Sequence, residues 1–419
     1  MEQTQSASDA HDKLLQWQRV RSFPIIVWLV LIGTFLSRLT YFMAWPFLVV
    51  FLYREYGASE IFVGSILAVS ALVGSVSGFG FGYVSDRIGR RRVMLGGCVL
   101  AMIGFAGLGL ADSLWQFFIL MILVGLMRPS VEQPGQALMS DYLENSRDRE
   151  LAFYLRYFMV NAGGAIGPLI GIALALHHPQ RLFLLTGASF VVYAIALKIG
   201  FHYCAKPAHT QQNSMTLKVH EVAAILRRDS LFASLILANL LMFFVYSQVE
   251  SSLPQVIAHS GLAHAGEWVS YLILINTITI VSFQFMLISL LDKMPVHLRI
   301  CSGVVLMGIA QFFFLASSTQ WPWGWLIGAF ILSLGETIVF PSLNVQLDRL
   351  APTDLRGSYF GAATLGGLGF ALGPFVGGMV LDHFNTTSLY IVCLAVIGVA
   401  LWGYIRISMQ LSSQKSRAS

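Results

Sequence analysis

The sequence is poor in charged residues, and this scarcity excludes an ordinary soluble globular protein. Only 11% of its 419 residues are Asp, Glu, Lys or Arg, whereas 56% are hydrophobic and the mean hydropathy is +0.70. Soluble domains carry about a quarter charged residues. A chain this apolar requires lipid as its solvent, so the sequence predicts an integral membrane protein whose main partner is the lipid bilayer.

Cysteine is equally scarce, and the patterns of catalytic and metal-binding sites are missing. The four cysteines, Cys98, Cys204, Cys301 and Cys393, are scattered without a Cys-x-x-Cys pair, so we interpret them as small apolar residues. The sequence has no histidine spacing that fits a metal, no nucleophile motif and no G-x-x-x-x-G-K-[ST] phosphate loop. These absences argue against an enzyme, a metal site and an ATP-driven pump, and we expect no cofactor other than a coupling proton.

Long hydrophobic runs, in contrast, are abundant. A transmembrane helix needs about 20 predominantly apolar residues. Twelve runs meet this requirement: 23–53, 60–85, 92–112, 115–140, 151–176, 182–203, 231–259, 268–291, 298–318, 323–347, 357–382 and 387–408. The predicted fold class is therefore an all-α integral membrane protein with twelve transmembrane helices.

Lysine and arginine are unequally distributed over the loops between these runs. When the N-terminus is placed inside, most of the 26 basic residues fall in inside segments, and only Arg54 and Arg181 fall in outside loops. An excess of positive charge marks the cytoplasmic side. We therefore expect a multi-pass protein of the cell inner membrane with both termini in the cytoplasm. Because the basic residues follow the topology, we expect no binding of nucleic acid.

The second half of the chain repeats a pattern of the first. A proline, an aspartate and an arginine recur with the same spacing, displaced by half the chain: Pro134, Asp141 and Arg149, then Pro341, Asp348 and Arg356. Such a displacement indicates a duplicated six-helix unit. Two parallel six-helix units related by an axis along the membrane normal are one architecture of secondary transporters.

The repeat divides the chain into five segments. They are a cytoplasmic N-terminal segment, 1–22, a first six-helix bundle, 23–203, a cytoplasmic linker, 204–229, a second bundle, 230–410, and a cytoplasmic tail, 411–419. Within the linker, apolar residues recur at helical spacing over Thr216–Asp229. This pattern predicts an amphipathic helix at the membrane surface, with a solvated linker as the alternative.

A glycine-rich basic motif lies between the second and third runs. It comprises Gly82, Asp86, Arg87, Gly89, Arg90 and Arg91. Gly82 permits a close helix approach, and Asp86 can accept a hydrogen bond from Arg90 or from a neighbouring helix end. The motif resembles the signature loop G-x-x-x-D-R-x-G-R-R of the major facilitator superfamily, and the likeness extends over essentially the whole chain. It implies the major facilitator fold, a monomeric secondary transporter and an inner gate at this loop.

Two glycine–proline motifs suggest a branch of that family. Their residues are Gly163, Gly167, Pro168 and Gly171 in the fifth run, and Gly373, Pro374, Gly377 and Gly378 in the eleventh. They resemble the G-P-x-x-G-G motif of drug/proton antiporters, although Ile172 replaces the last glycine in the fifth run. The likeness favours export, and close helix packing is the other explanation.

A weaker resemblance favours import. Residues 37–42, which contain Arg38 and Tyr41, resemble the E-R-F-x-Y-Y motif of proton-coupled peptide transporters, and the segment around Asn161 is similar to their fifth span. Ser37, however, replaces the glutamate that couples protons in that family. Import of a peptide-like or anionic solute is therefore the alternative function.

Ionisable residues inside the runs are candidate functional groups, because each costs about 2.5–3.5 kcal/mol to insert. Five occupy runs one, four, seven and ten, which the family resemblance places around a central cavity: Arg38, Arg128, Glu132, Glu250 and Glu336. The repeat relates Glu336 to Arg128, which predicts an acid and a base facing each other. Removal from water favours the neutral form of an acid. We therefore expect Glu336, Glu132 and Glu250 to be the candidate proton carriers, with Glu336 first.

Simpler explanations exist for several of these charges. Arg128 and Glu132 are four residues apart and could form a structural ion pair on one helix. Glu250 could be a gate residue near the outer mouth. Arg156, low in the fifth run, is expected to pair with acidic residues at the cytoplasmic helix ends.

Polar and aromatic residues complete the predicted cavity. Its candidates are Arg38, Tyr41, Trp45, Arg128, Asn161, Tyr246, Gln248, Asn276, Gln284 and Asn344. Ring faces beside a few polar groups suit a small amphipathic organic molecule. The predicted function is proton-coupled export of such molecules by alternating access, as in multidrug or metabolite efflux. A membrane sensor that does not transport is the remaining alternative.

Overall fold

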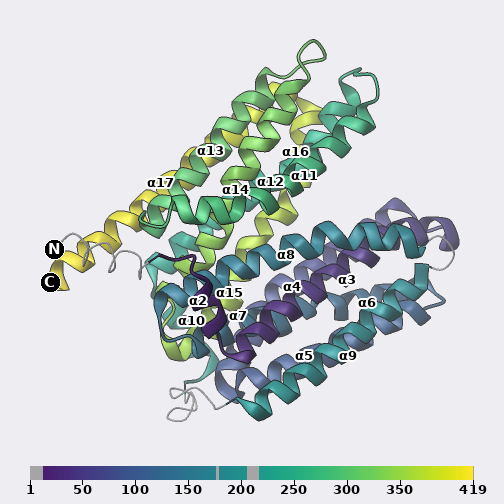
Figure 1. Ribbon diagram of the computed structural model, residues 1–419. Coiled ribbons are helices and arrows are strands. Elements are labelled where there is room, and N and C mark those ends of the chain that lie inside the picture. The colour runs from purple at the N-terminus through teal and green to yellow at the C-terminus, as the bar shows by residue number, and fades with distance from the viewer. Residues whose placement is uncertain (1–12, 176–178, 205–216, 419) are drawn as a thin grey trace.

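The computed structural model describes residues 13–175, 179–204 and 217–418, and its secondary structure in this part of the chain is helical (Figure 1). A first helix group contains α3 (Ile25–Tyr56), α4 (Glu60–Ile88), α5 (Arg90–Leu110), α6 (Leu114–Gly125), α7 (Gln133–Tyr142), α8 (Ser146–Ala175) and α9 (Pro179–Tyr203). A second group contains α11 (Ser230–His259), α12 (Ala265–Leu290), α13 (Val296–Ala316), α14 (Trp323–Leu350), α15 (Arg356–Ala362), α16 (Leu368–His383) and α17 (Thr386–Ala418). Two short helices, α2 (Trp17–Ser22) and α10 (Val219–Arg228), lie near the end where the groups converge.

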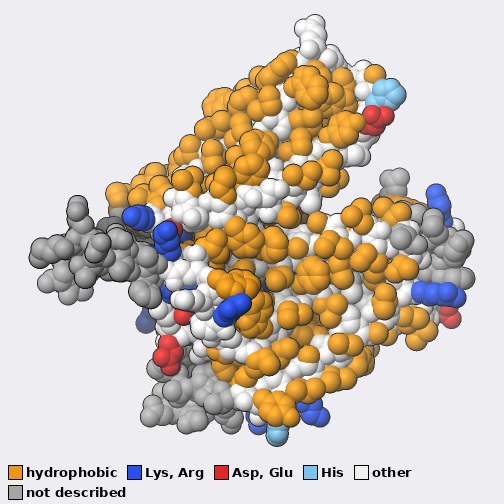
Figure 2. Space-filling model, in the orientation of Figure 1, with side chains coloured by type: hydrophobic (Ala, Val, Ile, Leu, Met, Phe, Trp, Pro, Cys, Tyr) orange, Lys and Arg blue, Asp and Glu red, His pale blue; other side chains and the backbone are white. Residues whose placement is uncertain are grey.

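Eleven spans in the described chain are long and apolar enough to cross a membrane, by length and composition. Hydrophobic side chains cover the sides of both groups, as contact with lipid requires (Figure 2). The fifth predicted run, 151–176, is not among the eleven. It forms most of α8, whose first turns carry Arg147, Asp148, Arg149 and Glu150. Arg147, Arg149 and Glu150 make contacts between the two groups, as described below, whereas Asp148 pairs with Arg19 of α2.

Two of the predicted single spans are broken. The run 115–140 forms α6 and α7, which are joined by a π-helical turn at Arg128–Glu132. Pro129 lies in this turn and lacks the N–H that a continuous α-helix would use, and π-turns are frequent at functional sites. The run 357–382 begins as α15, passes through a 3₁₀ segment at Ala363–Gly367 and continues as α16.

The two groups are joined at one end, which we call the closed end, and diverge toward the other, the open end (Figures 1 and 2). At the closed end, Asp86 accepts hydrogen bonds from the backbone N–H groups of Gly357 at 2.8 Å and Ser358 at 2.6 Å, and it also pairs with Arg90. Both expected partners of Asp86, an arginine and a neighbouring helix end, are therefore present. The helix end is the first turn of α15.

The other residues of this motif support the same junction. Gly89 has a φ of +96°, a conformation that suits glycine and that separates α4 from α5. Arg87 donates a hydrogen bond to the Tyr83 hydroxyl at 3.4 Å, and the Arg91 guanidinium lies 5.7 Å from the centre of the Phe201 ring. Asp86 contacts the second group directly, and Arg90 pairs with Asp86 and with Asp141 of the first group. Arg87 and Arg91, in contrast, contact aromatic side chains.

The repeated residues form reciprocal ion pairs across the closed end. Arg149 donates a hydrogen bond to Asp348 at 2.8 Å, and Arg356 lies 3.3 Å from Asp141. Each pair joins an arginine of one group to an aspartate of the other, as expected for a pseudo-symmetric interface. The duplicated pattern in the sequence is thus the pattern of contacts that joins the halves.

Further ion pairs between the two groups lie at the closed end. Arg299 of the second group contacts Glu150 at 2.5 Å, and Arg147 contacts Asp292 at 2.8 Å. The N-terminal segment takes part as well, because the backbone N–H of Leu14 also donates to Asp292, at 2.9 Å.

The amphipathic helix predicted over Thr216–Asp229 is present as α10. Val222 and Leu226, which are four residues apart, are its buried side chains, and Asp229 caps the start of α11. Residues 1–12 of the predicted N-terminal segment and residues 205–216 of the linker lie outside the described part of the chain. The predicted tail, 411–419, continues α17 as far as Ala418.

The glycine–proline motifs lie where helices pack closely. A Cβ atom at Gly167 would meet the Leu39 carbonyl oxygen of α3 at 2.5 Å, and one at Gly373 would collide with the Ser247 hydroxyl of α11. Gly378, in contrast, has open space around the position of a Cβ atom. Helix packing therefore accounts for most of the motif, as the alternative explanation proposed.

We expect Gly82→Val to weaken the closed end. A Cβ atom at Gly82 would collide with the Gly357 carbonyl oxygen, so α4 and α15 would have to separate. Spin labels at two exposed positions of this end, Ile88 on α4 and Leu298 on α13, should report a larger population at long distance. The measurement is the distance distribution by pulsed electron resonance in lipid nanodiscs.

Gly80→Val is the matched control, because a Cβ atom at Gly80 of the same helix meets nothing within 4 Å. The two partly exposed cysteines, Cys204 and Cys301, are replaced by serine in all samples. Identical distance distributions for Gly82→Val and Gly80→Val would contradict this account of the closed end.

Candidate functional site

Four charged side chains meet inside the first helix group. The Glu132 Oε2 atom lies 2.6 Å from Arg38 of α3, 3.3 Å from Arg156 of α8 and 3.7 Å from Arg128, one turn away on its own chain segment. We call these four residues the arginine cluster. The π-helical turn Arg128–Glu132 brings its acid and one of its bases to the same place.

Two expectations from the sequence are corrected by this cluster. Arg156 pairs with Glu132 instead of an acid at a helix end, because it lies more than a turn beyond Glu150 along α8. Arg128 has Glu132 as its ion-pair partner and does not pair with Glu336 among the described residues. The ion pair of Arg128 with Glu132 was the simpler explanation of these two residues, but two further arginines share the same oxygen.

The arginine cluster carries more positive than negative charge, because one carboxylate faces three guanidinium groups. Glu132 is 5% exposed, and Arg38 and Arg156 are 9% and 7% exposed, so water compensates little of this charge. The Oε1 atom of Glu132 and the Nε atoms of Arg38 and Arg156 have no hydrogen-bond partner among the described residues. The Arg128 side chain differs from the others, because it is 62% exposed.

A second acid lies at the boundary between the groups. Glu336 of α14 is 3% exposed and accepts three hydrogen bonds: from Tyr157 of α8 at 2.9 Å, Tyr246 of α11 at 3.1 Å and Asn276 of α12 at 2.7 Å. These donors are neutral, and no arginine, lysine or histidine of the described chain forms an ion pair with Glu336. The acid and base related by the repeat belong to different helix groups, and each finds its partners elsewhere.

Tyr246 and Asn276 were predicted from the sequence to line the cavity, whereas Tyr157 was not among the predicted site residues. Among the described residues, Tyr157 is the one donor to Glu336 from the first helix group. The signal in the sequence was its position next to Arg156 and one turn before Asn161, on a helix that already carried candidate residues. Asn161 itself donates to the backbone carbonyl of Tyr157, at 2.9 Å.

The aromatic candidates of α3 lie beside the arginine cluster. Tyr41 stacks on Trp45 with ring centroids 4.9 Å apart, and its ionisable neighbours are Arg38, Arg128 and Glu132. Arg38, Tyr41 and Trp45 are spaced by three and four residues, so they share one face of the helix. The structure therefore brings the candidates of α3 together with those of the π-helical turn.

Two amides predicted for the cavity serve instead to join helices. Gln248 is 3% exposed and donates to the Gly373 carbonyl of α16, and Gln284 is fully buried and donates to the Tyr154 carbonyl of α8. A buried amide in an apolar interior must find such partners. Asn344 donates to a carbonyl of its own helix, and Glu250 is exposed one turn beyond Tyr246.

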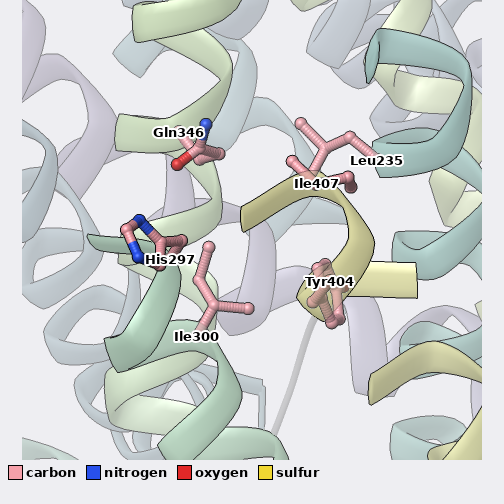
Figure 3. Close-up of a pocket in the computed structure, with 6 residues that line it drawn as sticks. All are labelled: Leu235, His297, Ile300, Gln346, Tyr404 and Ile407. Carbon is pink, nitrogen blue, oxygen red and sulfur yellow. The ribbon is translucent and has the colours of Figure 1, made fainter. Parts of the chain in front are cut away.

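A small pocket of about 10 Å³ lies apart from these groups, inside the second helix group (Figure 3). Its lining residues are Leu235, His297, Ile300, Gln346, Tyr404 and Ile407. Pockets for organic ligands measure about 300–1,000 Å³. The hollow between the two groups at the open end, visible in Figure 2, is therefore the better candidate for a ligand site.

Comparisons with known proteins agree on one family. A family described as Major Facilitator Superfamily matches residues 30–367. The uncharacterized MFS-type transporter YqjV of Bacillus subtilis (strain 168) is 30% identical over 401 residues, which are 94% of this chain and 97% of the relative. The multidrug resistance protein MdtH of Enterobacter sp. (strain 638) is 27% identical over 383 residues, with 89% and 92% covered.

A solved structure has the same fold. It is that of FucP, a Major Facilitator Superfamily transporter in the outward conformation, with a TM-score of 0.75 and 13% identity. The likeness covers 92% of this chain and 99% of the other, and at this identity it concerns the fold alone.

We expect Glu132→Gln to destabilise the protein strongly. The substitution leaves Arg38 and Arg156 buried without their counter-charge, which typically costs about 3–5 kcal/mol. Arg128→Gln is the comparison, because an exposed partner contributes about 1 kcal/mol or less. The measurement is the free energy of unfolding of the purified proteins in detergent micelles. Equal losses for the two variants would contradict the central position of Glu132.

Proposed function

The chain belongs to the major facilitator superfamily, and from this premise we propose that it exports small amphipathic organic molecules in exchange for protons. Membership of this family establishes that the protein is a multi-pass membrane transporter and not an enzyme. The proposal of proton-coupled export rests on the position of Glu336 at the boundary between the two helix groups. Its carboxyl group is buried and has no cationic partner in the described chain.

The contacts of Glu336 support a coupling role. As a carboxylate it accepts from Tyr157 of one group and from Tyr246 and Asn276 of the other. Hydrogen bonds to a charged acceptor are stronger than those to a neutral one. Protonation therefore weakens the link from Tyr157 across the boundary and changes how strongly the two groups hold each other. In this proposal the proton controls the alternation of the two groups around the site.

The orientation of the protein in the membrane supports entry of the proton from the outside. Arg90, Arg147, Arg149 and Arg356 lie at the closed end, and positive charge marks the cytoplasmic side. We place the closed end, with both termini, at the cytoplasmic face of the inner membrane, so the site is open to the outside in this state. A proton would enter there as an exported molecule leaves. A monomer suffices, because both groups belong to one chain.

Export is further supported by the multidrug resistance protein among the relatives. Import of an anionic or peptide-like solute with protons is the second candidate, and the excess of positive charge in the arginine cluster favours it. Both candidates use the same proton site. They differ in whether the proton and the organic molecule cross in opposite directions or in the same direction.

We expect Glu336→Gln to abolish coupled proton movement, because glutamine has a similar shape but cannot take up a proton. The measurement uses purified protein in vesicles that contain a pH-sensitive dye. Cationic dyes, anionic metabolites and dipeptides are added in turn under a preset proton gradient. In the wild-type protein a substrate should accelerate dissipation of the gradient, and in the variant it should not.

Glu267→Gln is the matched control, because the Glu267 side chain is 61% exposed and lies at the start of α12. It should behave as the wild-type protein does. Proton movement in the same direction as the solute would replace export by import. Substrate-driven proton movement that persists in Glu336→Gln would refute the role of Glu336.

A further inference from the structure

We propose that the transported molecule carries an anionic group and that Arg128 is the residue that binds it. This inference rests on the proposed transport function and specifies the substrate class of the same site. The anion would complete the arginine cluster, and its apolar part would lie against Tyr41 and Trp45.

The charge of the arginine cluster is uncompensated within the described chain. Glu132 accepts hydrogen bonds from Arg38 at 2.6 Å and from Arg156 at 3.3 Å, whereas the Arg128 Nε atom remains at 3.7 Å, beyond hydrogen-bond distance. The ionisable groups close to Arg128 are Arg38, Glu132 and Tyr41. Since Arg38 repels Arg128 and Glu132 is already engaged twice, Arg128 is the least compensated of the three bases.

Arg128 is also the accessible member of the arginine cluster. Its side chain is 62% exposed, whereas those of Arg38 and Arg156 are 11% and 9% exposed. An arginine directed at lipid in the middle of a membrane is costly, so such residues face a cavity or the bundle interior. The arginine cluster lies near the boundary between the groups, because Arg156 is next to Tyr157 on α8 and Tyr157 reaches across to Glu336.

Unpaired buried atoms behind Arg128 add to the positive charge at the same place. The Nε atoms of Arg38 and Arg156 lack a hydrogen-bond partner among the described residues, although both residues are more than nine-tenths buried. Buried polar atoms of this kind are normally paired with protein, water or a ligand. A carboxylate or phosphate is the chemistry that guanidinium groups bind with two parallel hydrogen bonds.

The aromatic face of α3 explains why the anion would be an organic one. Tyr41 and Trp45 are stacked at 4.9 Å on the same helix face as Arg38, one and two turns toward the open end. Both rings are partly exposed. A planar apolar body would lie against these rings while its charged group reached Arg128.

The opposite wall offers less to a cation. Glu336 is buried and both of its oxygens already accept hydrogen bonds, so Glu250 is the accessible acid of the second group near this boundary. One exposed carboxylate does not balance the arginine cluster across the hollow. Charge complementarity therefore favours an anion, and a cation bound at Glu250 is the contrary outcome of the test.

The test measures equilibrium binding with three probes that share a ring and differ in charge: 2-naphthoate, 2-naphthamide and 2-naphthylmethylammonium. Calorimetric titrations use the full-length protein in nanodiscs without a proton gradient. We expect 2-naphthoate to bind the wild-type protein at least about tenfold more tightly than either other probe, as one charge-assisted hydrogen-bonded pair provides. Arg128→Gln should reduce 2-naphthoate binding to the level of the amide, and Arg128→Lys should retain part of the preference.

Arg54→Gln is the matched control, because it removes the same charge from an exposed position near the end of α3. It should leave the preference intact. Equal binding of the three probes, preference for the ammonium, no binding of 2-naphthoate up to about 1 mM, or an unchanged preference in Arg128→Gln would each overturn the anion site.

Because binding is measured without a gradient, this result is independent of proton coupling. Selective binding of 2-naphthoate together with proton movement that does not depend on Glu336 would refute the coupling proposal and leave the anion site standing. Proton movement driven by a cation, with no preference for 2-naphthoate, would do the reverse.

Discussion

The contact on which the rest of the structure depends is the junction of Asp86 with the first turn of α15. One carboxylate accepts two backbone hydrogen bonds from the opposite helix group and also pairs with Arg90. The reciprocal pairs Arg149–Asp348 and Arg356–Asp141 lie in the same layer. Because the two groups are held together at this end, they can diverge at the other, and the hollow between them is open there (Figure 2).

The two walls of the hollow have different electrostatic character although they derive from one repeated unit. The first wall carries the arginine cluster, in which the negative charge of Glu132 is compensated but positive charge remains on the arginines. The second carries Glu336, whose partners are neutral hydroxyl and amide groups. A compensated acid remains charged, whereas an acid with neutral partners in an apolar interior can change its protonation state. The duplication therefore supplied symmetric closure at one end, and divergence of the sequence supplied two different chemical sites.

Much of the fold could be predicted from the sequence, because the period and length of hydrophobic runs are set by the bilayer and need no tertiary information. The repeat of Pro134, Asp141 and Arg149 and the motif around Asp86 were also visible, because each is a spacing of residues along one chain. Pro129 signals a disturbed helix in the run 115–140, but the π-helical turn at Arg128–Glu132 could not be foreseen, since a proline can also kink or end a helix. Nor could Gln248 and Gln284 be separated from cavity residues, because a polar residue in a span either lines a cavity or satisfies a buried carbonyl.

The sequence by itself determined that this is a helical membrane protein with two related halves, and which ionisable groups enter the membrane. Those properties depend on composition, periodicity and spacing along one chain. Only the tertiary structure decided the pairing: Arg38, Arg128 and Arg156 converge on one carboxylate, and Tyr157 reaches Glu336 from the other group. Pairing depends on how helices far apart in sequence rotate and approach one another. The strength of a buried charge interaction changes over a few ångströms, so residue types and spacing alone cannot specify it.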